Sequence, residues 1–592
     1  MAWGMEERTV SPVIGWARIA TGLAQGLLLW GLVEATKHKV WPATDDVTMG
    51  ALSTVAAMVP IVLLGGLAEI RRLTLIIWAS VAAVVLAGLA VHDVASRATE
   101  NPGVGGLVDD GFWFAAGLFI AHHLVAAADA DRKLIARFAT YFDLAWKHGV
   151  QLVMSAAFVG VFWLVLALGA GLFKLIGIDF VAELIAKPWF ALPASGAMFA
   201  AAVQLTDVRH GLIRGIRTVA LTLLSWLLPV LAFLTGAFLV ALPFTGLEPL
   251  WESWSATGIL LSASAVMIIL INAAYQDGEP DTPTPLILRW AARLGGLLLI
   301  PLIGLAGYAL SLRIGQYGLT PDRILGVACV IAGACYAVGY AVAAVLPGAW
   351  MKLLELTNVV TAFVTVGLIL ALFSPLADPA KLSVNDQMAR IADGRLKPDK
   401  VDYRFLRFDS ERYGVAALET LKKKGGETGK RAAVALTATN RYAESELTAA
   451  ANAEDIAVWP KGRILPPEFL ARAWDEFPQG RSWCRQTRSD CDAVFVDLDG
   501  DGHEEIVLRR RDGATVYERR ADNGWAVVGT ANGFRCDGAV QALREGRFKL
   551  VAPRWRDFEI NGLRVHIDAT WEGCDGTPGT NSVTIVNVPP KR

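Results

Sequence analysis

Long hydrophobic runs fill the first two thirds of the chain, and the last of them, Val359–Leu376, contains no charged residue. A helix of about 18 apolar residues crosses most of the roughly 30 Å hydrocarbon core of a bilayer. The earlier runs have comparable lengths, so we expect about eleven membrane-spanning helices. The predicted spans are Ile19–Val33, Val47–Leu67, Leu73–Val91, Gly111–Ala128, Val150–Ile176, Trp189–Leu205, Thr218–Pro243, Ala256–Tyr275, Leu286–Leu312, Ile324–Leu346 and Val359–Leu376.

The charges between these runs predict how the helices are oriented. Cytoplasmic loops carry an excess of Lys and Arg. If the N-terminus is cytoplasmic, most basic loop residues from Arg71 to Lys352 fall on the cytoplasmic side, whereas Lys37 and Lys39 do not. No small-residue cleavage site follows the first run before Lys37, so we expect a retained span rather than a signal peptide. An odd number of crossings then places the C-terminus outside the cytoplasm.

The chain becomes polar after Leu376. A short amphipathic helix is predicted before Gly394, and a second helix between a cap at Asp409 or Ser410 and an end at Gly425. Short β-rich segments follow from about Val458 and predict a small antiparallel sheet or sandwich. The predicted strands are Ala493–Val496, Glu505–Leu508, Thr515–Glu518, Trp525–Val528, Phe548–Val551, Leu563–Ile567 and Val583–Val586.

These patterns predict the fold class and the domains. We expect a mainly α protein, in which a polytopic helical membrane bundle precedes a small soluble domain of α+β or β-rich type. The expected parts are a multi-pass transmembrane domain at residues 1–377, a helical linker region at 378–456 and a β-rich domain at 457–592.

The composition indicates which partners the chain is expected to have. Hydrophobic residues make up 54% and charged residues 19% of the chain, and the formal net charge is −1. The expected partner is therefore a lipid bilayer, and nucleic acid is not expected. Several charged residues lie near the ends of predicted spans, where we expect them to act as topology anchors. They are Arg18, Glu34, Glu69, Lys174, Arg289 and Arg293.

Four polar residues within the predicted spans are candidates for an intramembrane site. His122 and His123 lie late in the fourth span and could bind a metal or relay a proton. Neighbouring side chains on a helix point about 100° apart, so the two rings need ligands from elsewhere to share one metal. Gln204 and Asn272 are further inward-facing candidates. The alternative for each residue is an ordinary structural role.

The motif DLDGDGHEE at residues 497–505 predicts a metal site in the C-terminal part. A tight loop turns the carboxylates of Asp497, Asp499 and Asp501 inward, and its two glycines permit the necessary backbone angles. His503 would add its backbone carbonyl and Glu505 a side chain. Such oxygen ligands suit a structural Ca²⁺ ion. The loop resembles that of integrin-type FG-GAP repeats, although a hairpin with solvated acids is the alternative.

Four of the six cysteines lie in the β-rich part, namely Cys484, Cys491, Cys536 and Cys574. Proximity favours a disulfide between the first two and another between the last two, in an oxidising compartment. A zinc site is the alternative, but no CxxC spacing supports it. Cys329 and Cys335 fall within an apolar span, where we expect buried small hydrophobic residues.

Two sequence segments and the multi-span block between them resemble a known family. They are WARIATGLAQGLLLWGLVEA at Trp16–Ala35 and DPAKLSVNDQMARIADGRLKPDKVDYRFLRFDSERYGVAALETL after the last span. On these segments the chain resembles a bacterial inner-membrane family known as domain of unknown function 4153, down to about Leu421. The resemblance implies an inner-membrane location, with the Asp-rich loop on an appended periplasmic module. It implies no activity and no catalytic residue.

Two functions of different classes fit these observations. The first is transport or permeation through the bundle, and the second is a non-enzymatic envelope sensor or scaffold with a periplasmic protein partner. A membrane enzyme acting on lipid-linked material would need a polar cluster facing the outer leaflet. The scarcity of central charges argues against proton coupling. A polar cavity lined by Gln204, Asn272 or His122 would favour transport, whereas a densely packed bundle would favour scaffolding.

Overall fold

The computed structural model describes residues 12–97, 111–208, 210–247, 255–278, 284–438, 456–472, 491–510, 513–520, 524–532, 538–551, 558–560 and 563–565. The chain divides into two compact units. The helical unit comprises Met1–Val401 and Asp409–Ala417, and the C-terminal unit comprises Asp402–Phe408 and Leu418–Arg592.

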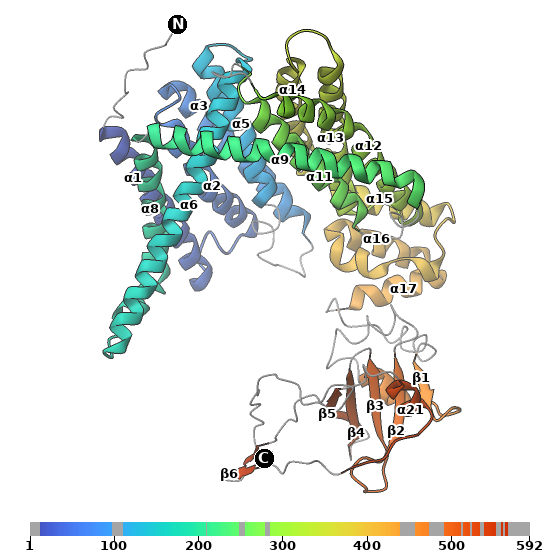
Figure 1. The fold of residues 1–592 in the computed structure, drawn as a ribbon. Helices are drawn as coiled ribbons and strands as arrows, with labels where there is room; N and C mark the ends of the chain where they lie inside the picture. The colour runs from blue at the N-terminus through green and yellow to red at the C-terminus, as the bar shows by residue number, and fades with distance from the viewer. Residues whose placement is uncertain are drawn as a thin grey trace. The chain divides into compact units, whose positions relative to one another are not determined.

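Within its described residues, the helical unit contains eleven helices that are long and apolar enough to cross a membrane (Figure 1). This number confirms the prediction from the hydrophobic runs. A short helix, α7 (Phe180–Ile185), precedes the sixth of them. The eleven are α1 (Pro12–His38), α2 (Asp46–Gly66), α3 (Arg72–Ser96), α5 (Gly111–Asp131), α6 (Phe138–Leu175), α8 (Pro188–Val208), α9 (His210–Thr245), α11 (Ala256–Tyr275), α12 (Leu286–Tyr317), α13 (Pro321–Val345) and α14 (Leu353–Leu372).

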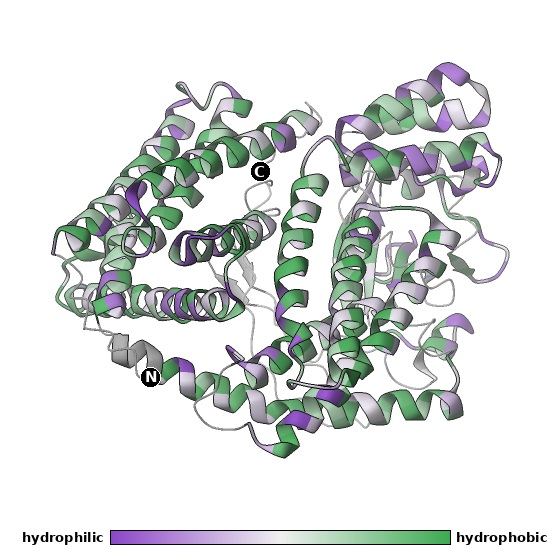
Figure 2. Ribbon diagram, turned by 90° about the horizontal axis from the view of Figure 1, so that it is seen from above, coloured by the Kyte–Doolittle hydropathy of each residue, from purple (hydrophilic) through white to green (hydrophobic). Residues whose placement is uncertain are grey.

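Hydrophobic residues predominate along these helices (Figure 2). A helix satisfies its backbone hydrogen bonds internally, which is what a chain segment in lipid requires. Helix α2 begins where the Asp45 side chain accepts a hydrogen bond from the Thr48 N–H. Helix α6 begins at Phe138, earlier than the predicted Val150, because its first turns are amphipathic rather than wholly apolar. Its 38 residues extend about 57 Å at 1.5 Å per residue.

Helices α1 and α8 cross at glycine residues and lie side by side (Figure 1). A Cβ atom added at Gly22 would lie only 2.2 Å from the carbonyl oxygen of Gly196. A Cβ atom added at Gly26 would lie 2.4 Å from the carbonyl oxygen of Leu192. The two backbones are therefore in direct contact, as at small-residue crossings of membrane helices. This contact brings polar residues early in α1 close to the end of α8.

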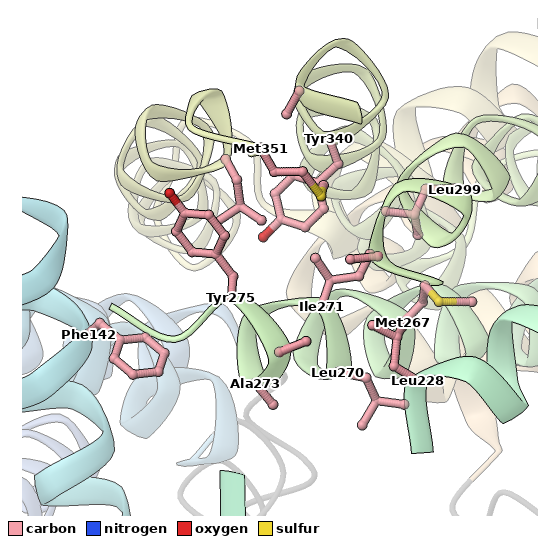
Figure 3. Packing of buried hydrophobic residues seen from close by; sticks show 14 of the residues in the cluster. Phe142, Leu228, Met267, Leu270, Ile271, Ala273, Tyr275, Leu299, Tyr340 and Met351 are labelled. Atoms are coloured by element: carbon pink, nitrogen blue, oxygen red, sulfur yellow. The ribbon is translucent and has the colours of Figure 1, made fainter. Parts of the chain in front are cut away.

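The largest apolar cluster of the helical unit lies mainly among α9, α11, α12, α13 and α14. Met267, Ile271, Leu299 and Tyr340 are completely buried there and pack against one another (Figure 3). Phe142 adds a ring from α6. The second half of the bundle is thus densely packed around this cluster.

Helix α15 (Pro379–Ala392) follows the last span, as predicted, and belongs to the helical unit. Asp378 caps it by accepting a hydrogen bond from the Lys381 N–H, and its carboxylate also lies 3.0 Å from Nε2 of His92. Further along, Asp386 accepts a hydrogen bond from the Leu319 N–H at 2.8 Å. The helix is therefore held to α3 and to the connection between α12 and α13.

The next helices follow the local signals in the sequence. Helix α16 (Glu411–Lys424) ends as predicted at Gly425, which adopts a φ of 75°. Helix α17 (Gly426–Thr437) follows directly and was not predicted. Two single turns, η1 (Pro398–Lys400) and η2 (Phe405–Asp409), precede α16.

Five strands of the C-terminal unit form one sheet in the order β1-β2-β3-β4-β5. β1 runs parallel to β2, and the other neighbours are antiparallel. Phe469 packs on Tyr517 and Trp525 to cover one face. The elements are β1 (Ala457–Trp459), α19 (Pro467–Arg472), β2 (Asp492–Val496), β3 (Glu505–Arg510), β4 (Gly513–Arg519), β5 (Trp525–Asn532), α21 (Ala539–Arg544) and the separate pair β6 (Phe558–Ile560) and β7 (Leu563–Val565).

The predicted strands that correspond to β2, β3, β4 and β5 are confirmed, and β7 begins at the predicted Leu563. The prediction at Phe548–Val551 is wrong, because this segment is irregular and Val551 is 84% exposed. β1 was missed because three residues are too few to show a strand pattern. The predicted strand Val583–Val586 lies outside the described part of the chain.

Candidate functional site

An ion pair is buried between α1 and α8. Nη2 of Arg18 lies 2.9 Å from Oδ2 of Asp207, and the two side chains are only 2% and 1% exposed. Either charge alone would be very costly to remove from water, whereas the pair compensates much of that penalty. The glycine crossing of the two helices keeps the partners within reach of each other.

The other donors of Arg18 connect a third helix. Nη1 donates to Oε1 of Gln204 at 2.8 Å, and Nε donates to the carbonyl oxygen of Leu64 in α2 at 3.2 Å. One guanidinium therefore joins α1, α2 and α8. Gln204, which was predicted as an inward-facing polar residue, takes part in this site as a hydrogen-bond acceptor.

Lys147 of α6 extends the ion pair into a network. Its Nζ lies 2.8 Å from Oδ1 of Asp207 and also binds the carboxylate of Glu69, which follows α2. The charges alternate in the order Arg18, Asp207, Lys147 and Glu69, so their formal sum is zero. Such a compensated arrangement allows charged groups to persist inside an apolar bundle. We call these four residues the ionic network.

Three histidines adjoin the ionic network. Nε2 of His123 lies 2.9 Å from Nδ1 of His148, which directly follows Lys147 in α6. The ring of His122 is centred 5.4 Å from that of His123 and 5.8 Å from that of His148. All three side chains are buried. The structure therefore brings together the two predicted histidines and a third that the sequence did not single out.

His122 is held from one side. Its Nδ1 accepts a hydrogen bond from Nε1 of Trp78 at 3.2 Å, and its Nε2 has no hydrogen-bond partner within the described structure. Among the described residues, the three histidines do not form a group whose ligand atoms are close enough to share one metal ion. The metal-binding alternative for His122 and His123 therefore lacks a ligand set in this part of the chain.

Asn272 belongs to a different network. Its Nδ2 donates to the hydroxyl of Tyr340 at 2.7 Å, and that hydroxyl donates to Oδ1 of Asn358 at 3.1 Å. These three side chains come from α11, α13 and α14, and none of them is charged. The structure thus separates Asn272 from the site that contains His122 and Gln204.

An apolar groove lies between α9 and α12. Its walls include Leu239 and Pro243 on one helix and Pro301 and Gly304 on the other. None of the predicted polar residues lines it, so its chemistry suits a hydrocarbon chain rather than a polar solute.

Arg18 was expected as a topology anchor near the end of a span, but it is 1% exposed and ion-paired inside the bundle. Asp207 was missed because α8 continues past the predicted end at Leu205. His148 was missed because it precedes the apolar part of α6. The available signals were the opposite charges beside apolar runs and the Gly22–Gly26 spacing, which indicates close helix contact.

Residues 55–421 match a family model described as Domain of unknown function (DUF4153). The chain belongs to the DUF4153 family. Searches of curated proteins and of solved structures find no match. Lys147, His148 and Asp207 lie within the segment that matches the DUF4153 model, whereas Arg18 precedes it.

The Asp-rich loop of this DUF4153 protein follows the matched segment and connects β2 to β3. Ligand atoms of Asp497, Asp499 and Asp501 lie within 4.8 Å of one another. Asp497 accepts hydrogen bonds from the N–H groups of Gly500 and Gly502, both with positive φ. These three carboxylates lie close enough together to hold a metal ion, and the calcium assignment stays a prediction.

The two other predicted ligands of this loop, Glu505 and His503, form hydrogen bonds within the loop. Glu505 is buried, and its Oε2 accepts a hydrogen bond from the Leu498 N–H at 2.7 Å. Burial raises the pKa of Glu505, and the charges of Asp499 and Asp501 add to that rise. His503 is exposed, and its N–H donates to Asp501.

Of the four cysteines in the β-rich part, Cys491 is buried directly before β2, and Cys484, Cys536 and Cys574 lie outside the described residues. Both disulfides therefore stay predictions. In the helical unit, Cys329 and Cys335 are free thiols, and Cys329 is exposed on its helix rather than buried as expected.

Asp492, next to Cys491, carries a second buried ionic site. Its carboxylate accepts hydrogen bonds from Arg509 at 2.5 and 2.8 Å, from Arg544 at 2.8 and 3.1 Å and from Nε1 of Trp459 at 2.9 Å. Burial raises the pKa of Asp492, but these donors together lower it below its usual range. The site joins β1, β2, β3 and α21.

Proposed function

We propose that this DUF4153 protein mediates transport or permeation, and that the helices around the ionic network form the working part. The supporting observation is the Arg18–Asp207 pair, whose side chains are 2% and 1% exposed in a helical membrane unit. Ionisable groups inside membrane bundles are costly and mark solute pathways and relays more often than packing sites.

The position of the network on α1, α2, α6 and α8 also supports this proposal. Lys147 has two carboxylate partners, Asp207 and Glu69, on different segments. Exchange between such partners is a means by which helices change their relative positions, as alternating access requires. The neutral network at Asn272 offers no comparable exchange.

A sensor or scaffold with an envelope protein partner is the second candidate function. The fully buried cluster at Met267, Leu299 and Tyr340 favours it, since a densely packed bundle suits an anchor. This candidate requires no aqueous path to the ionic network.

Cysteine accessibility distinguishes the two functions. In a variant whose native cysteines are replaced by serine, we introduce Gln204→Cys and treat membrane vesicles of both orientations with a membrane-impermeant thiosulfonate. A transport pathway predicts labelling from at least one side, because Gln204 lies against Arg18. Leu134→Cys, at a site 95% exposed between α5 and α6, is the positive control, and Leu228→Cys, at a fully buried site, is the negative control.

Labelling of Leu134→Cys without labelling of Gln204→Cys from either side would contradict a pathway and favour the scaffold. Each variant is first checked for a monodisperse elution profile in detergent, so that labelling reports the folded protein.

We further propose a bacterial inner-membrane location, with the N-terminus in the cytoplasm and the C-terminal unit in the periplasm. The odd number of candidate spans in the described residues and the basic loops support this orientation. Alkaline phosphatase fused after Arg592 should be active, and a green fluorescent protein fused there should be dark. The reverse result would also remove the basis for disulfides between the four C-terminal cysteines.

The Asp-rich loop is proposed as a structural Ca²⁺ site. Calcium at 100 times its dissociation constant would stabilise the folded C-terminal unit by about 2.7 kcal/mol. Limited proteolysis of the full chain should therefore be slower in calcium than in chelator, and Asp499→Ala should remove the difference. Equal cleavage rates in wild type under both conditions would contradict calcium binding.

A further inference from the structure

The hydrogen bonds at the histidines define where protons sit. Nδ1 of His123 lies 2.6 Å from the carbonyl oxygen of Phe119, which can only accept, so this nitrogen carries a proton. In the neutral ring Nε2 of His123 is then an acceptor, and it receives the Nδ1–H of His148 at 2.9 Å. The remaining nitrogen of His148, Nε2, is consequently the free base of the pair.

We propose that His123 and His148 form a proton-carrying pair, so that H⁺ is the ion that moves in the transport proposed above, on which this inference rests. A proton taken up from water forms an N–H bond at Nε2 of His148. The proton shared by the two rings passes from Nδ1 of His148 to Nε2 of His123, which becomes the charged ring. Release reverses these two steps, and no other bond changes.

The surroundings of the pair favour this use. His123 as a charged ring donates through Nδ1 to the Phe119 carbonyl and through Nε2 to His148. Charge-assisted hydrogen bonds of this kind stabilise the ion that they surround. The pair therefore has partners ready for both of its protonation states.

Other ionisable groups face the pair from neighbouring helices. His122 of α5, Lys147 of α6 and Arg18 of α1 act on His148 electrostatically, and Asp207 of α8 and Glu69 bind the two cations. A proton on the pair repels Lys147 and Arg18, and so weakens their present arrangement. Protonation of the histidines is thereby linked to the ionic network that joins α1, α6 and α8.

Proton flux into proteoliposomes that contain the full-length protein tests the pair. The vesicles enclose a pH-sensitive dye, and valinomycin with a potassium gradient supplies the driving force. Replacement of one ring should lower the flux roughly 100-fold, which is the lower end of what a positioned proton-transfer group contributes. The variants are His148→Gln and His123→Gln, and the matched control is His38→Gln, an exposed histidine at the end of α1.

Loss of flux in both variants, with wild-type flux in the control, supports the pair. Wild-type flux in either variant of the pair overturns it. Since a buried substitution can impair folding, flux through the wild type is also measured with equal Na⁺, K⁺ and Cl⁻ on both sides and a pH gradient alone. Flux that does not follow the pH gradient overturns the inference without any variant.

The remaining outcomes separate this inference from the proposed function. If wild type carries no protons but Gln204→Cys is labelled, H⁺ is the wrong ion, and transport of another solute stands. If wild type carries no protons and Gln204→Cys is unlabelled, both proposals fail.

Discussion

Each unit of the molecule buries one aspartate between two cations, and the two sites differ in what surrounds them. Asp207 in the helical unit meets Arg18 and Lys147, and Asp492 in the C-terminal unit meets Arg509 and Arg544. Both carboxylates are at most 1% exposed. Asp492 is bound by donors from β1, β3 and α21, whereas Asp207 is linked through Lys147 to Glu69 and lies close to three histidines.

The two sites are equally buried, so the difference between them lies in the partners that each charged group has. The carboxylate of Asp492 is bound by two arginines and a tryptophan. Such a closed site fixes strands and a helix in one arrangement. The Asp207 site includes Lys147, which has two carboxylate partners, so it can change its pairing without leaving a charge alone.

Asp492→Asn should have the largest effect on stability. It leaves Arg509 buried without its countercharge, and breaking a buried pair in this way costs about 3–5 kcal/mol. Pulse proteolysis of the full chain in urea, followed through a C-terminal tag, measures the loss. An unchanged urea midpoint would show that the Asp492 site does not stabilise the C-terminal unit.

The Asp492 site should lose its contribution to stability in acid. The folded pKa of Asp492 is lowered, so its contribution is complete above the unfolded value of about 3.9 and is lost as pH falls through the folded pKa. The resistance of wild type to pepsin should therefore decrease as the pH falls from about 3.9 through the folded pKa of Asp492. Asp492→Asn should show a shallower pH dependence over the same range, and an equal slope would contradict the assignment.

Asp207→Asn should have the next largest effect. Arg18 then lacks its only carboxylate in the ionic network, and an uncompensated charge within a membrane helix costs about 2.5–3.5 kcal/mol. Thermal unfolding in detergent measures the change. Asp143→Asn is the matched control, because Asp143 pairs with Arg217 but is 50% exposed. Equal losses in the two variants would remove the distinction between a buried network and a surface pair.

Gly22→Ala tests how the first site is positioned. The new methyl group would meet the Gly196 carbonyl at 2.2 Å, and crowding of this kind costs about 1–3 kcal/mol. Gly31→Ala, on the same helix but with nothing within 4 Å of its added methyl group, should be neutral. Equal melting temperatures of the two variants would show that the close contact between α1 and α8 does not contribute to stability.

Asn272→Ala should have the smallest effect. It removes one side-chain hydrogen bond to Tyr340, and such bonds in membrane proteins contribute about 0.6 kcal/mol on average. Tyr340 keeps its bond to Asn358. Proton flux should equal that of wild type, and a large loss would mean that the functional site extends into the second half of the bundle.

The spans could be predicted from the sequence because each depends on a local run of apolar residues. The predicted and observed starts coincide at Gly111, Ala256 and Leu286, and three others differ by a single residue. Capping residues likewise predicted α16 and its end at Gly425. The strands beside the Asp-rich loop were visible from their alternation and from the turn residues between them.

The site could be predicted only in part, because its contacts join distant positions. Arg18 and Gln204 are 186 residues apart, and no local pattern relates them. His123 and His148 are 25 residues apart and lie on different helices. His122, His123 and Gln204 stood out as polar residues in apolar runs, but Lys147 and Asp207 looked like ordinary loop charges because the helices extend beyond their apolar cores.

The length of α6 has a mechanical consequence. A rod of about 57 Å cannot stand upright within a hydrocarbon layer of roughly 30 Å, so it must lean or project from it. Lys147 and His148 sit near its first third, and any change in lean shifts them relative to α1 and α8. We therefore expect the contacts of these two side chains to depend on the thickness of the surrounding lipid.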